Sequence, residues 1–347
     1  KGSAKKVGKQ KLEPEHFREA GGDLHRLQRQ IVSGEVVVED DASAVLSLGG
    51  NDRLRWLDSL VSQQVADLKI EETTEALLLS PQGRIEHSFL LTDDGHLTWL
   101  LTRKKEISAL EDWLRSMVFR MEVSIQRPQG LVLFSSPVNA NFKSLDPIVL
   151  FSDPWPKIGA ESVGLKEQDH PGSGWSMLTA LVEQDKKSSL AVPTVRPEFC
   201  EPLRIAAARP SMEEVDEKSI PHELDWLRTA VHLNKGCYRG QESVAKVHNL
   251  GQPPRRLTIL HLDGSRSQLP EKGDEVLSDG DRVGRISRAG WHYELGPLAL
   301  AVLKRNVPEN QDLLVQCKEI KLAARQETIV PAGSRDKKDI FRLGPLR

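Results

Sequence analysis

The chain has 347 residues, enough for two or three domains at about 150 residues each and for a core that needs no disulfide or structural metal. Its 48 basic and 50 acidic residues nearly cancel, so the composition does not indicate direct nucleic-acid binding. Three widely spaced cysteines argue against a disulfide framework or a zinc site, and no apolar run approaches the roughly 20 residues of a membrane-spanning helix.

The first eleven residues contain five lysines and no apolar stretch of the kind found in secretory signals. Residues 1–33 are therefore expected to be an N-terminal tail and lead-in, with a basic RNA-binding arm as the alternative. Residues 331–347 are expected to be a C-terminal tail. Together with the few cysteines, these features predict a cytoplasmic protein in a reducing compartment.

Residues 34–126 have the pattern of a compact α+β unit. Asn51 and Asp52 favour a helix N-cap, and a stripe of apolar residues follows them: Leu54, Leu57, Leu60 and Val61. Alternating and turn-bounded runs predict a three-stranded meander over 76–79, 85–91 and 97–102. A second helix is predicted from another helical stripe: Ile107, Leu110, Leu114, Met117 and Val118.

Residues 127–199 are less regular. Apolar runs at 131–134 and 148–151 predict strands, and the prolines between and after them mark loops or edges. A second small α+β unit is expected here.

Residues 200–250 are expected to carry a helix and a glycine-rich turn. Pro221 suits the first turn of a helix that would end near Asn234 and Gly236. Its apolar face would consist of Leu224, Leu227 and Val231. From 251 to 330, short strand patterns separated by turns predict a small β-barrel.

The segment Lys235-Gly236-Cys237-Tyr238-Arg239-Gly240-Gln241-Glu242 is the strongest candidate for a functional site. Its two glycines can take positive φ or let the backbone approach a ligand closely. Gln241 can begin a helix, with Glu242 favourably placed at its positive end. Cys237 would then lie just before a helix N-terminus and between Lys235 and Arg239, an environment that lowers the pKa of a thiol.

Two interpretations of this segment stay open. Cys237 is either a reactive or ligand-facing thiol, with Tyr238 as a stacking surface, or a buried cysteine in a glycine turn. Cys200 and Cys317 have no comparable sequence surroundings, and the alternating run around Cys317 predicts a core position.

The whole motif resembles the Lys-Gly-Cys-Tyr-x-Gly-Gln-Glu signature of the YgfZ family, whose members are relatives of the glycine-cleavage aminomethyltransferase. The resemblance covers most of residues 35–305 and is carried by further segments: 48–52, 82–85, 203–205, 220–223, Gly251, 255–257, 283–287 and 296–301.

The resemblance implies an α+β fold in which three domains form a ring, the last being a β-barrel. The expected domains are a folate-binding unit (34–126 with 200–250), a second small unit (127–199) and the barrel (251–330). It also implies tetrahydrofolate, or a one-carbon derivative, bound in a central channel. The residues expected to contact it are Arg204, Glu223, Lys235, Gly236, Tyr238, Arg239, Gly240, Gln241 and Glu242.

The implied function is that of a folate-binding accessory protein supporting iron–sulfur cluster assembly or repair and related tRNA modification, with Cys237 essential. The expected partners are folate and iron–sulfur client enzymes. A monomer is expected, with no bound metal and no contact with a membrane or nucleic acid.

Two departures from the family bear on whether the protein is an enzyme. Relatives carry an Arg-x-Glu-Ala-Gly run whose glutamate reads the pterin ring, whereas here Ala206 replaces that glutamate. Glu213, Glu223 and Glu242 are the open substitutes. An acidic pair of the relatives is replaced by Glu86-His87-Ser88. Both changes favour a protein that binds folate without transferring a group.

Two alternatives remain. One is a tetrahydrofolate-dependent aminomethyltransferase or methyltransferase. The other is a thiol redox protein using Cys237, which is disfavoured because no second cysteine is near it in the sequence.

Overall fold

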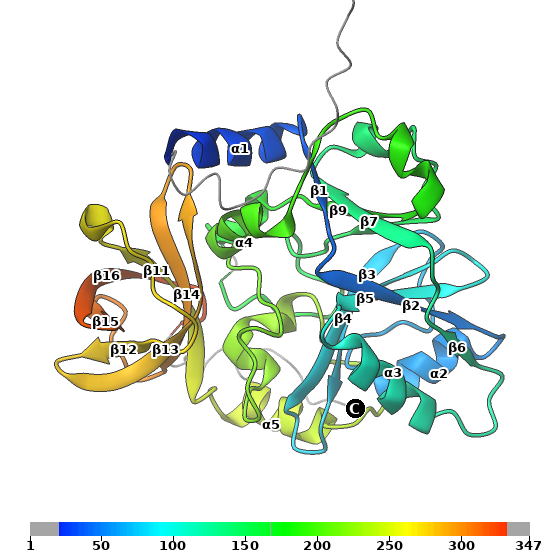
Figure 1. Cartoon of the computed structure of the whole chain (residues 1–347). Coiled ribbons are helices and arrows are strands. Elements are labelled where there is room, and N and C mark those ends of the chain that lie inside the picture. The colour runs from blue at the N-terminus through cyan, green and yellow to red at the C-terminus, as the bar shows by residue number, and fades with distance from the viewer. Residues whose placement is uncertain (1–20, 167, 332–347) are drawn as a thin grey trace, which may run out of the picture.

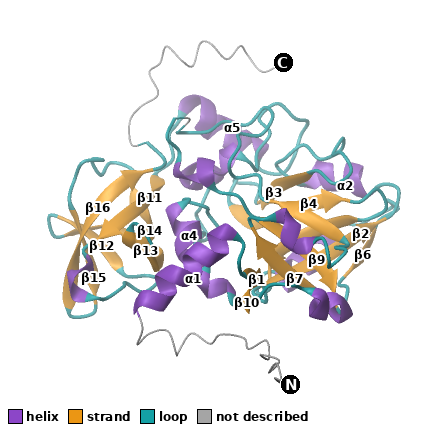
Figure 2. Cartoon of the chain, turned by 90° about the horizontal axis from the view of Figure 1, so that it is seen from above, coloured by secondary structure: helices purple, strands orange, loops and turns teal. Residues whose placement is uncertain are grey.

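The computed structural model describes residues 21–166 and 168–331, which form two five-stranded sheets and a closed six-stranded barrel. The barrel lies at one side and the sheets at the other, with helices α4 (Glu201–Ala206) and α5 (Gln241–Leu250) between them (Figure 1 and Figure 2). The predicted α+β class and C-terminal barrel are confirmed. The lysine-rich run and residues 332–347 lie outside the described residues.

The first sheet has the strand order β3-β4-β5-β2-β6. Its strands are β2 (Ser43–Gly49), β3 (Thr73–Leu79), β4 (Ile85–Asp93), β5 (Thr98–Arg103) and β6 (Ser124–Gln126). Helices α2 (Arg53–Leu60) and α3 (Ile107–Ser116) share an apolar core with this sheet. The predicted meander and both helices are confirmed, because apolar periodicity is a local signal.

Asp52 occupies the N-cap position of α2, as predicted, but its side chain forms no capping hydrogen bond. Asp52 has a helical backbone (φ −89°, ψ −2°), and its carboxylate accepts a hydrogen bond from the backbone N–H of Glu122 at 2.8 Å. The side chain of Asn51 donates to the Glu122 carboxylate at 3.0 Å. Both polar side chains thus join the helix to the loop before β6, a contact outside the reach of a local capping rule.

The second sheet has the order β10-β1-β7-β9-β8 and is antiparallel except between β1 and β10. Its strands are β1 (Val37–Glu39), β7 (Leu131–Ser136), β8 (Val149–Ser152), β9 (Leu178–Glu183) and β10 (Thr194–Val195). The predicted strands at 131–134 and 148–151 are confirmed as β7 and β8. The early strand β1 belongs to this sheet, so the second sheet draws on residues from 37 to 195.

The barrel closes in the order β11-β14-β13-β12-β15-β16, with β16 pairing back to β11. Its strands are β11 (Arg255–Leu262), β12 (Glu275–Ser278), β13 (Asp281–His292), β14 (Gly296–Lys304), β15 (Leu313–Cys317) and β16 (Ile320–Thr328). Cys317 is buried in its core, as predicted. Helix α1 (Gly21–Ser33), which the sequence did not predict, contacts the barrel through a 2.7 Å hydrogen bond from Gln28 to the carbonyl of Trp291.

Residues 221–233 differ from the predicted single helix. Two short 3-10 helices occupy this segment, η6 (Pro221–Leu224) and η7 (Trp226–Arg228). The predicted apolar residues are nevertheless fully buried: Leu224, Leu227 and Val231.

Asp225 separates the two short helices because its backbone is left-handed, with φ 55°. Its buried carboxylate accepts a hydrogen bond from the backbone N–H of Leu165 at 3.0 Å and lies 3.3 Å from Nε2 of His170. These partners are about 55 to 60 residues away in the sequence, so a long-range contact overrides the helical pattern.

The remaining short helices are η2 (Asn139–Phe142), η3 (Pro171–Gly174), η4 (Gln184–Ser189), η5 (Pro197–Phe199) and η8 (Gly264–Arg266). Across the described part of the chain, no helix combines the length and the apolar character needed to cross a membrane.

Candidate functional site

The predicted motif, residues 235–242, forms the turn that leads into α5, with Gly240 at the N-cap. Gly240 has φ +85°, and a Cβ at this position would lie 2.5 Å from the carbonyl oxygen of Ser80. Gly83 lies on the opposite side of this contact, where an added Cβ would lie 2.8 Å from the Cβ of Ser243. Glycine is therefore required at both positions for the β3–β4 turn to pack on the start of α5.

Lys235 is buried and points toward the end of α2. Its Nζ donates to the backbone carbonyls of Asp58 at 2.6 Å, Val61 at 3.0 Å and Gln63 at 2.7 Å. The ring of Tyr238 lies beside it, with its centroid 5.7 Å from Nζ, and is 7% exposed. The structure thus places both residues in the core, where Lys235 stabilises the motif loop and the ring expected to stack on a ligand is packed.

Cys237, by contrast, is exposed. Arg239 forms an ion pair with Glu86 at 2.9 Å and lies over the ring of Trp113 at 5.9 Å. Both cations that flank Cys237 in the sequence therefore have partners elsewhere. Gly236 has open space beside it, because an added Cβ would meet no described atom within 4 Å.

Two of the other expected ligand contacts in this region, Glu223 and Gln241, are held by structural partners, and Glu242 is exposed. Glu223 is fully buried, and its two oxygens accept hydrogen bonds from Arg255 at 2.9 Å and 2.8 Å. The Gln241 side chain donates to the carbonyl of Lys235 at 3.0 Å, and Glu242 is exposed in the first turn of α5.

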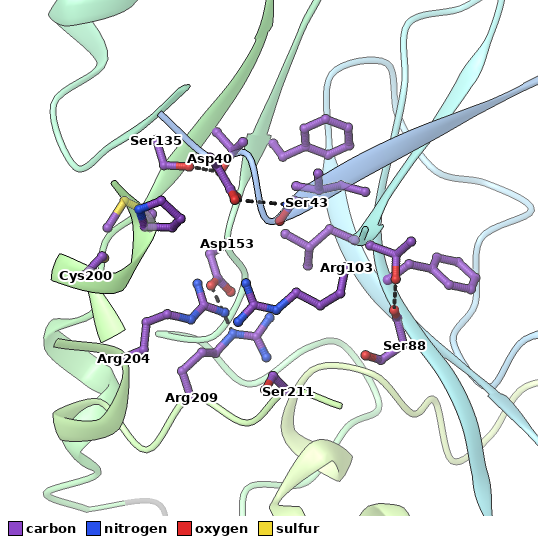
Figure 3. Close-up of a pocket in the computed structure, with 18 of the residues that line it drawn as sticks. Asp40, Ser43, Ser88, Arg103, Ser135, Asp153, Cys200, Arg204, Arg209 and Ser211 are labelled. Carbon is purple, nitrogen blue, oxygen red and sulfur yellow. Dashed lines mark hydrogen bonds and ion pairs between the residues drawn. The ribbon is translucent and has the colours of Figure 1, made fainter. Parts of the chain in front are cut away.

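A cavity of about 110 Å³ lies where the two sheets meet α4. Among the predicted site residues, all of which are described, Arg204 lines this cavity and the motif residues do not. Arg103 from the end of β5 and Arg209 from the chain after α4 point toward the same space, and Asp153 lies beside Arg209 (Figure 3).

Arg209 is held by two buried carboxylates. Its Nε donates to Asp153 at 3.0 Å and its Nη1 donates to Glu75 at 3.1 Å. Burial alone would raise the pKa of Asp153, but the positive charges of Arg209 and Arg204, together with hydrogen bonds from Arg209 and Trp175, hold the pKa below its ordinary value. Glu75 also accepts a hydrogen bond from the indole of Trp226 at 3.0 Å. This pair of acids is therefore fully engaged.

Glu201 is shared among arginines. It accepts hydrogen bonds from Arg103 at 3.2 Å and from Arg288 of the barrel at 2.8 Å. Burial opposes its charge, yet the arginines lower its pKa to about 2. Arg204 is more weakly paired, with its Nε 3.9 Å from Glu201 and its guanidinium 5.6 Å over the ring of Trp175.

Cys200 also lines the cavity and is 5% exposed. The sequence predicts no positive charge near Cys200, but in the structure the charges of Arg103 and Arg204 act on its thiol. Burial nevertheless dominates and raises the pKa of the thiol to about 12, so Cys200 presents a neutral thiol.

The two departures from the family, residues 86–88 and Ala206, can be placed relative to this cavity. Ser88, from the run that replaces the acidic pair, lines it on β4, while Ala206 is half-buried in α4. Of the described residues, Asp40 also lines the cavity, and its Oδ1 accepts hydrogen bonds from two backbone N–H groups. The three proposed substitutes do not line it: Glu213, Glu223 and Glu242.

An open groove of about 770 Å³ continues from the cavity toward the barrel. The two share three lining residues: Arg103, Pro197 and Glu201. Glu213 crosses this groove by forming ion pairs with Lys105 of the first sheet region and Lys272 of the barrel. Within the described ranges, no group of three or more histidines, cysteines or acids is placed to hold a metal ion.

Sequence reasoning missed most of the cavity. Asp40, Arg103, Asp153 and Arg209 lie on separate parts of the chain and belong to no motif. The only local signal was the spacing of Arg204 and Arg209 around the short helix α4, and it does not by itself indicate a site.

No family model matches the chain. The tRNA-modifying protein YgfZ of Klebsiella pneumoniae (strain 342) is 23% identical over 278 residues, which cover 77% of this chain and 84% of that protein. A putative chloroplastic transferase of Arabidopsis thaliana is 30% identical over 134 residues, but this match spans 30% of its length. An aminomethyltransferase of Thermotoga maritima is 36% identical over 98 residues, which are 25% of that protein.

The crystal structure of the glycine cleavage system aminomethyltransferase T from Bartonella henselae superposes with a TM-score of 0.68 at 16% identity. The superposition covers 89% of each chain. It shows that this chain has the aminomethyltransferase fold, and the YgfZ likeness extends over most of its length. The chain is thus similar to YgfZ proteins over most of its length, and it has the fold of an aminomethyltransferase.

Proposed function

We propose that this protein binds tetrahydrofolate, or a one-carbon derivative of it, in the cavity and the adjoining groove. The observation that carries the proposal is the pair Arg103 and Arg204 facing a cavity at the centre of an aminomethyltransferase fold. Guanidinium groups donate to carboxylates and other acceptors, and folate carries both kinds of acceptor. When bound, tetrahydrofolate supplies ring nitrogens that can carry a one-carbon unit.

Two of the acids that line the cavity are poor candidates for a general base. A general base near neutral pH needs a pKa close to 7. The pKa of Glu201 is about 2, and that of Asp153 lies below its ordinary value because Arg209 stabilises the carboxylate. Acids held so firmly in the ionised form are poor proton acceptors. This observation supports an accessory role.

The cellular role proposed is support of iron–sulfur cluster assembly or repair and of related tRNA modification, in the cytoplasm and as a monomer. The name of the relatives from K. pneumoniae and Aliivibrio fischeri, tRNA-modifying protein, supports this direction. Cys237 is the essential thiol in the proposal. Since Cys237 is exposed and the cavity is lined by other residues, it would meet a client enzyme rather than the folate.

Calorimetric titration with tetrahydrofolate tests the ligand. We expect saturable binding to the wild type and to Cys237→Ala, and no saturable binding to an Arg103→Gln, Arg204→Gln double variant. The exposed Arg266→Gln serves as control and should bind like the wild type. Failure of the wild type to bind at millimolar folate would overturn the proposal.

Complementation tests the thiol separately. In cells lacking the endogenous protein, Cys237→Ala should bind folate yet fail to restore the activity of iron–sulfur enzymes. Full restoration by this variant would remove Cys237 from the proposed function.

The alternative is a folate-dependent transferase, which the names of the Arabidopsis and Thermotoga relatives favour. It predicts that the purified protein forms methylene- or methyl-tetrahydrofolate from an amine donor. Mass spectrometry of the folate pool after incubation with such donors would detect the product, and its catalytic formation would replace the accessory role.

A further inference from the structure

A chain of buried hydrogen bonds connects the floor of the cavity to the motif turn, residues 235–242. The floor is formed by Arg209, which donates to Asp153 at 3.0 Å and to Glu75 at 3.1 Å. Glu75 also accepts a hydrogen bond from the hydroxyl of Thr229. Arg209, Glu75 and Thr229 are at most 3% exposed. These side chains therefore hold one another in place without the help of solvent.

Gln63, in the segment that follows α2, is the next link. Its side-chain amide donates to the backbone carbonyl of Thr229 at 2.8 Å. The backbone carbonyl of Gln63 accepts a hydrogen bond from Nζ of Lys235 at 2.7 Å. Gln63 and Lys235 are both buried, so each of these groups would lose its partner without gaining water if the neighbour moved. The network thus ends on the first residue of the motif.

Ser62 holds the same segment against β3, the strand that carries Glu75. Its hydroxyl accepts a hydrogen bond from the backbone N–H of Leu77 at 3.1 Å and donates to the carbonyl of Ala230 at 2.6 Å. Its backbone carbonyl accepts a hydrogen bond from the N–H of His232 at 3.0 Å. The segment after α2 therefore lies between the strand at the cavity and the chain that leads into the motif.

The other end of the motif turn contacts β3 as well. This strand runs from the cavity floor at Glu75 to Leu79, and the carbonyl oxygen of the next residue, Ser80, faces Gly240. The approach is so close that a Cβ on Gly240 would lie 2.5 Å from this oxygen. Both ends of the motif turn, at Lys235 and at Gly240, thus depend on the strand that contributes to the cavity floor.

We infer that occupancy of the cavity controls the motif turn, because a ligand packed on the cavity floor stabilises the turn with Lys235 docked at the end of α2. Thr229 and Gln63 are the positioning residues that couple the two sites. A buried polar network is cooperative, since loss of one member leaves its neighbours unsatisfied. Coupling of this kind is reciprocal, so a loosened turn also weakens binding in the cavity.

This coupling gives the ligand a regulatory role toward the partner of Cys237. With the cavity filled, the turn presents the exposed thiol in one geometry, and with the cavity empty the turn opens more often. The inference rests on the proposed function for the identity of the ligand and for the role of Cys237. The network itself consists of contacts within the chain.

Hydrogen exchange of backbone amides in the full chain, measured by mass spectrometry, tests the coupling. The amides of His232 and Gln241 report on the turn, because they donate to backbone carbonyls at 3.0 Å and 3.2 Å. Thr229→Val keeps the shape of the side chain and removes its hydrogen bond to Glu75. It should speed exchange of both amides about 10-fold, the effect of one lost hydrogen bond to a charged group. Amides of β14 in the barrel are the reference for global unfolding.

Thr179→Val is the matched control. Thr179 is also a buried threonine and lines the cavity, but its hydroxyl pairs with that of Ser135 at 2.8 Å. Its replacement should leave the exchange of the two reporter amides at the wild-type rate. Gln63→Leu breaks the next link and should act like Thr229→Val, so the test does not depend on the folding of one variant. If neither network variant speeds exchange relative to β14, or if Thr179→Val speeds it equally, the coupling is overturned.

Tetrahydrofolate at saturation provides the second arm. It should slow exchange of the two reporter amides at least about 5-fold relative to β14 in the wild type, and by less in Thr229→Val. If calorimetry shows that it binds while this exchange is unchanged, the coupling is overturned and the folate proposal stands. If it does not bind while Thr229→Val speeds exchange selectively, the coupling stands and the folate proposal falls.

Discussion

The chemistry of a thiol in this protein depends on burial more than on its neighbours in the sequence. Cys200 has Arg103 and Arg204 nearby, yet burial raises its pKa to about 12. Burial likewise raises the pKa of Cys317 to about 11. Cys237 is exposed, and the two positively charged residues that flank it in the sequence, Lys235 and Arg239, have partners elsewhere.

Alkylation should therefore distinguish the three cysteines. At pH 8 a thiol with a pKa near 12 is ionised in roughly one molecule in ten thousand, and the thiolate is the nucleophile. Iodoacetamide should label Cys237 in the native protein and spare Cys200 and Cys317, as read by peptide mass spectrometry. All three should react in denaturant, and native Cys237→Ser should stay unlabelled. Native labelling of Cys200 at the rate of Cys237 would contradict this account.

Lys235 shows how far the sequence could predict the site at the scale of one residue. The letters of the motif indicate a functional segment, but they do not indicate where each side chain points. Lys235 turns inward because three carbonyl oxygens at the end of α2 satisfy its ammonium group, and these lie more than 170 residues earlier.

At the scale of elements, the motif joins α5 to the turn between β3 and β4. This contact depends on Gly240, whose backbone is left-handed and whose Cα faces the carbonyl of Ser80. Gly236 lies four residues earlier in open space. Steric contact therefore requires glycine at position 240 but not at position 236.

Replacing each glycine by alanine should separate structure from function. Gly240→Ala should lower the free energy of unfolding by at least about 1–2 kcal/mol, the cost of a left-handed backbone for a non-glycine residue. Gly236→Ala should change it by less than about 0.5 kcal/mol, as is usual for surface sites. Urea unfolding measures both. Equal destabilisation by the two variants would show that the turn contact is not the cause.

The elements that were predicted correctly are those with strong local patterns. The meander, α3 and the barrel strands follow from apolar alternation and stripes. The segment 221–233 has a helical stripe as well, but Asp225 forms buried contacts with Leu165 and His170 that interrupt it. The helix prediction fails here because a tertiary contact overrides the local propensity.

At the scale of the molecule, acids in and after α4 bind cations of the barrel and hold it against the rest of the chain. Glu201 and Glu214 pair with Arg288, and Glu214 is fully buried. Glu213 pairs with Lys272, and Asp216 pairs with Arg255. The docking of the barrel thus depends on carboxylates that must stay ionised.

This arrangement predicts a loss of stability in acid. The pKa of Glu201 and that of Glu213 are about 2 in the folded protein, because nearby cations outweigh burial, against an ordinary value of 4.5. Protons therefore bind the unfolded chain first, so the stabilisation is present above about pH 4.5 and is lost as the pH falls toward 2.

Thermal unfolding between pH 6 and pH 2.5 measures this loss. Glu201→Gln should reduce the steepness of the decline, because it removes one of the groups that take up a proton. Glu271→Gln is the control, since the ion pair of Glu271 with the exposed Lys318 lies within the barrel region and its loss should leave the slope nearly unchanged. A Glu201→Gln protein with the slope of the wild type would show that other groups govern acid unfolding.

By itself the sequence determined the α+β class, the barrel, most strands and the presence of a recognisable motif, because each is written in neighbouring residues. Only the tertiary structure decided that the motif lies outside the central cavity. It also decided that Arg103, Asp153 and Arg204 meet inside that cavity. Side chains from a strand end, a loop and a short helix are brought together by packing of the sheets against α4, and no local pattern encodes such a meeting.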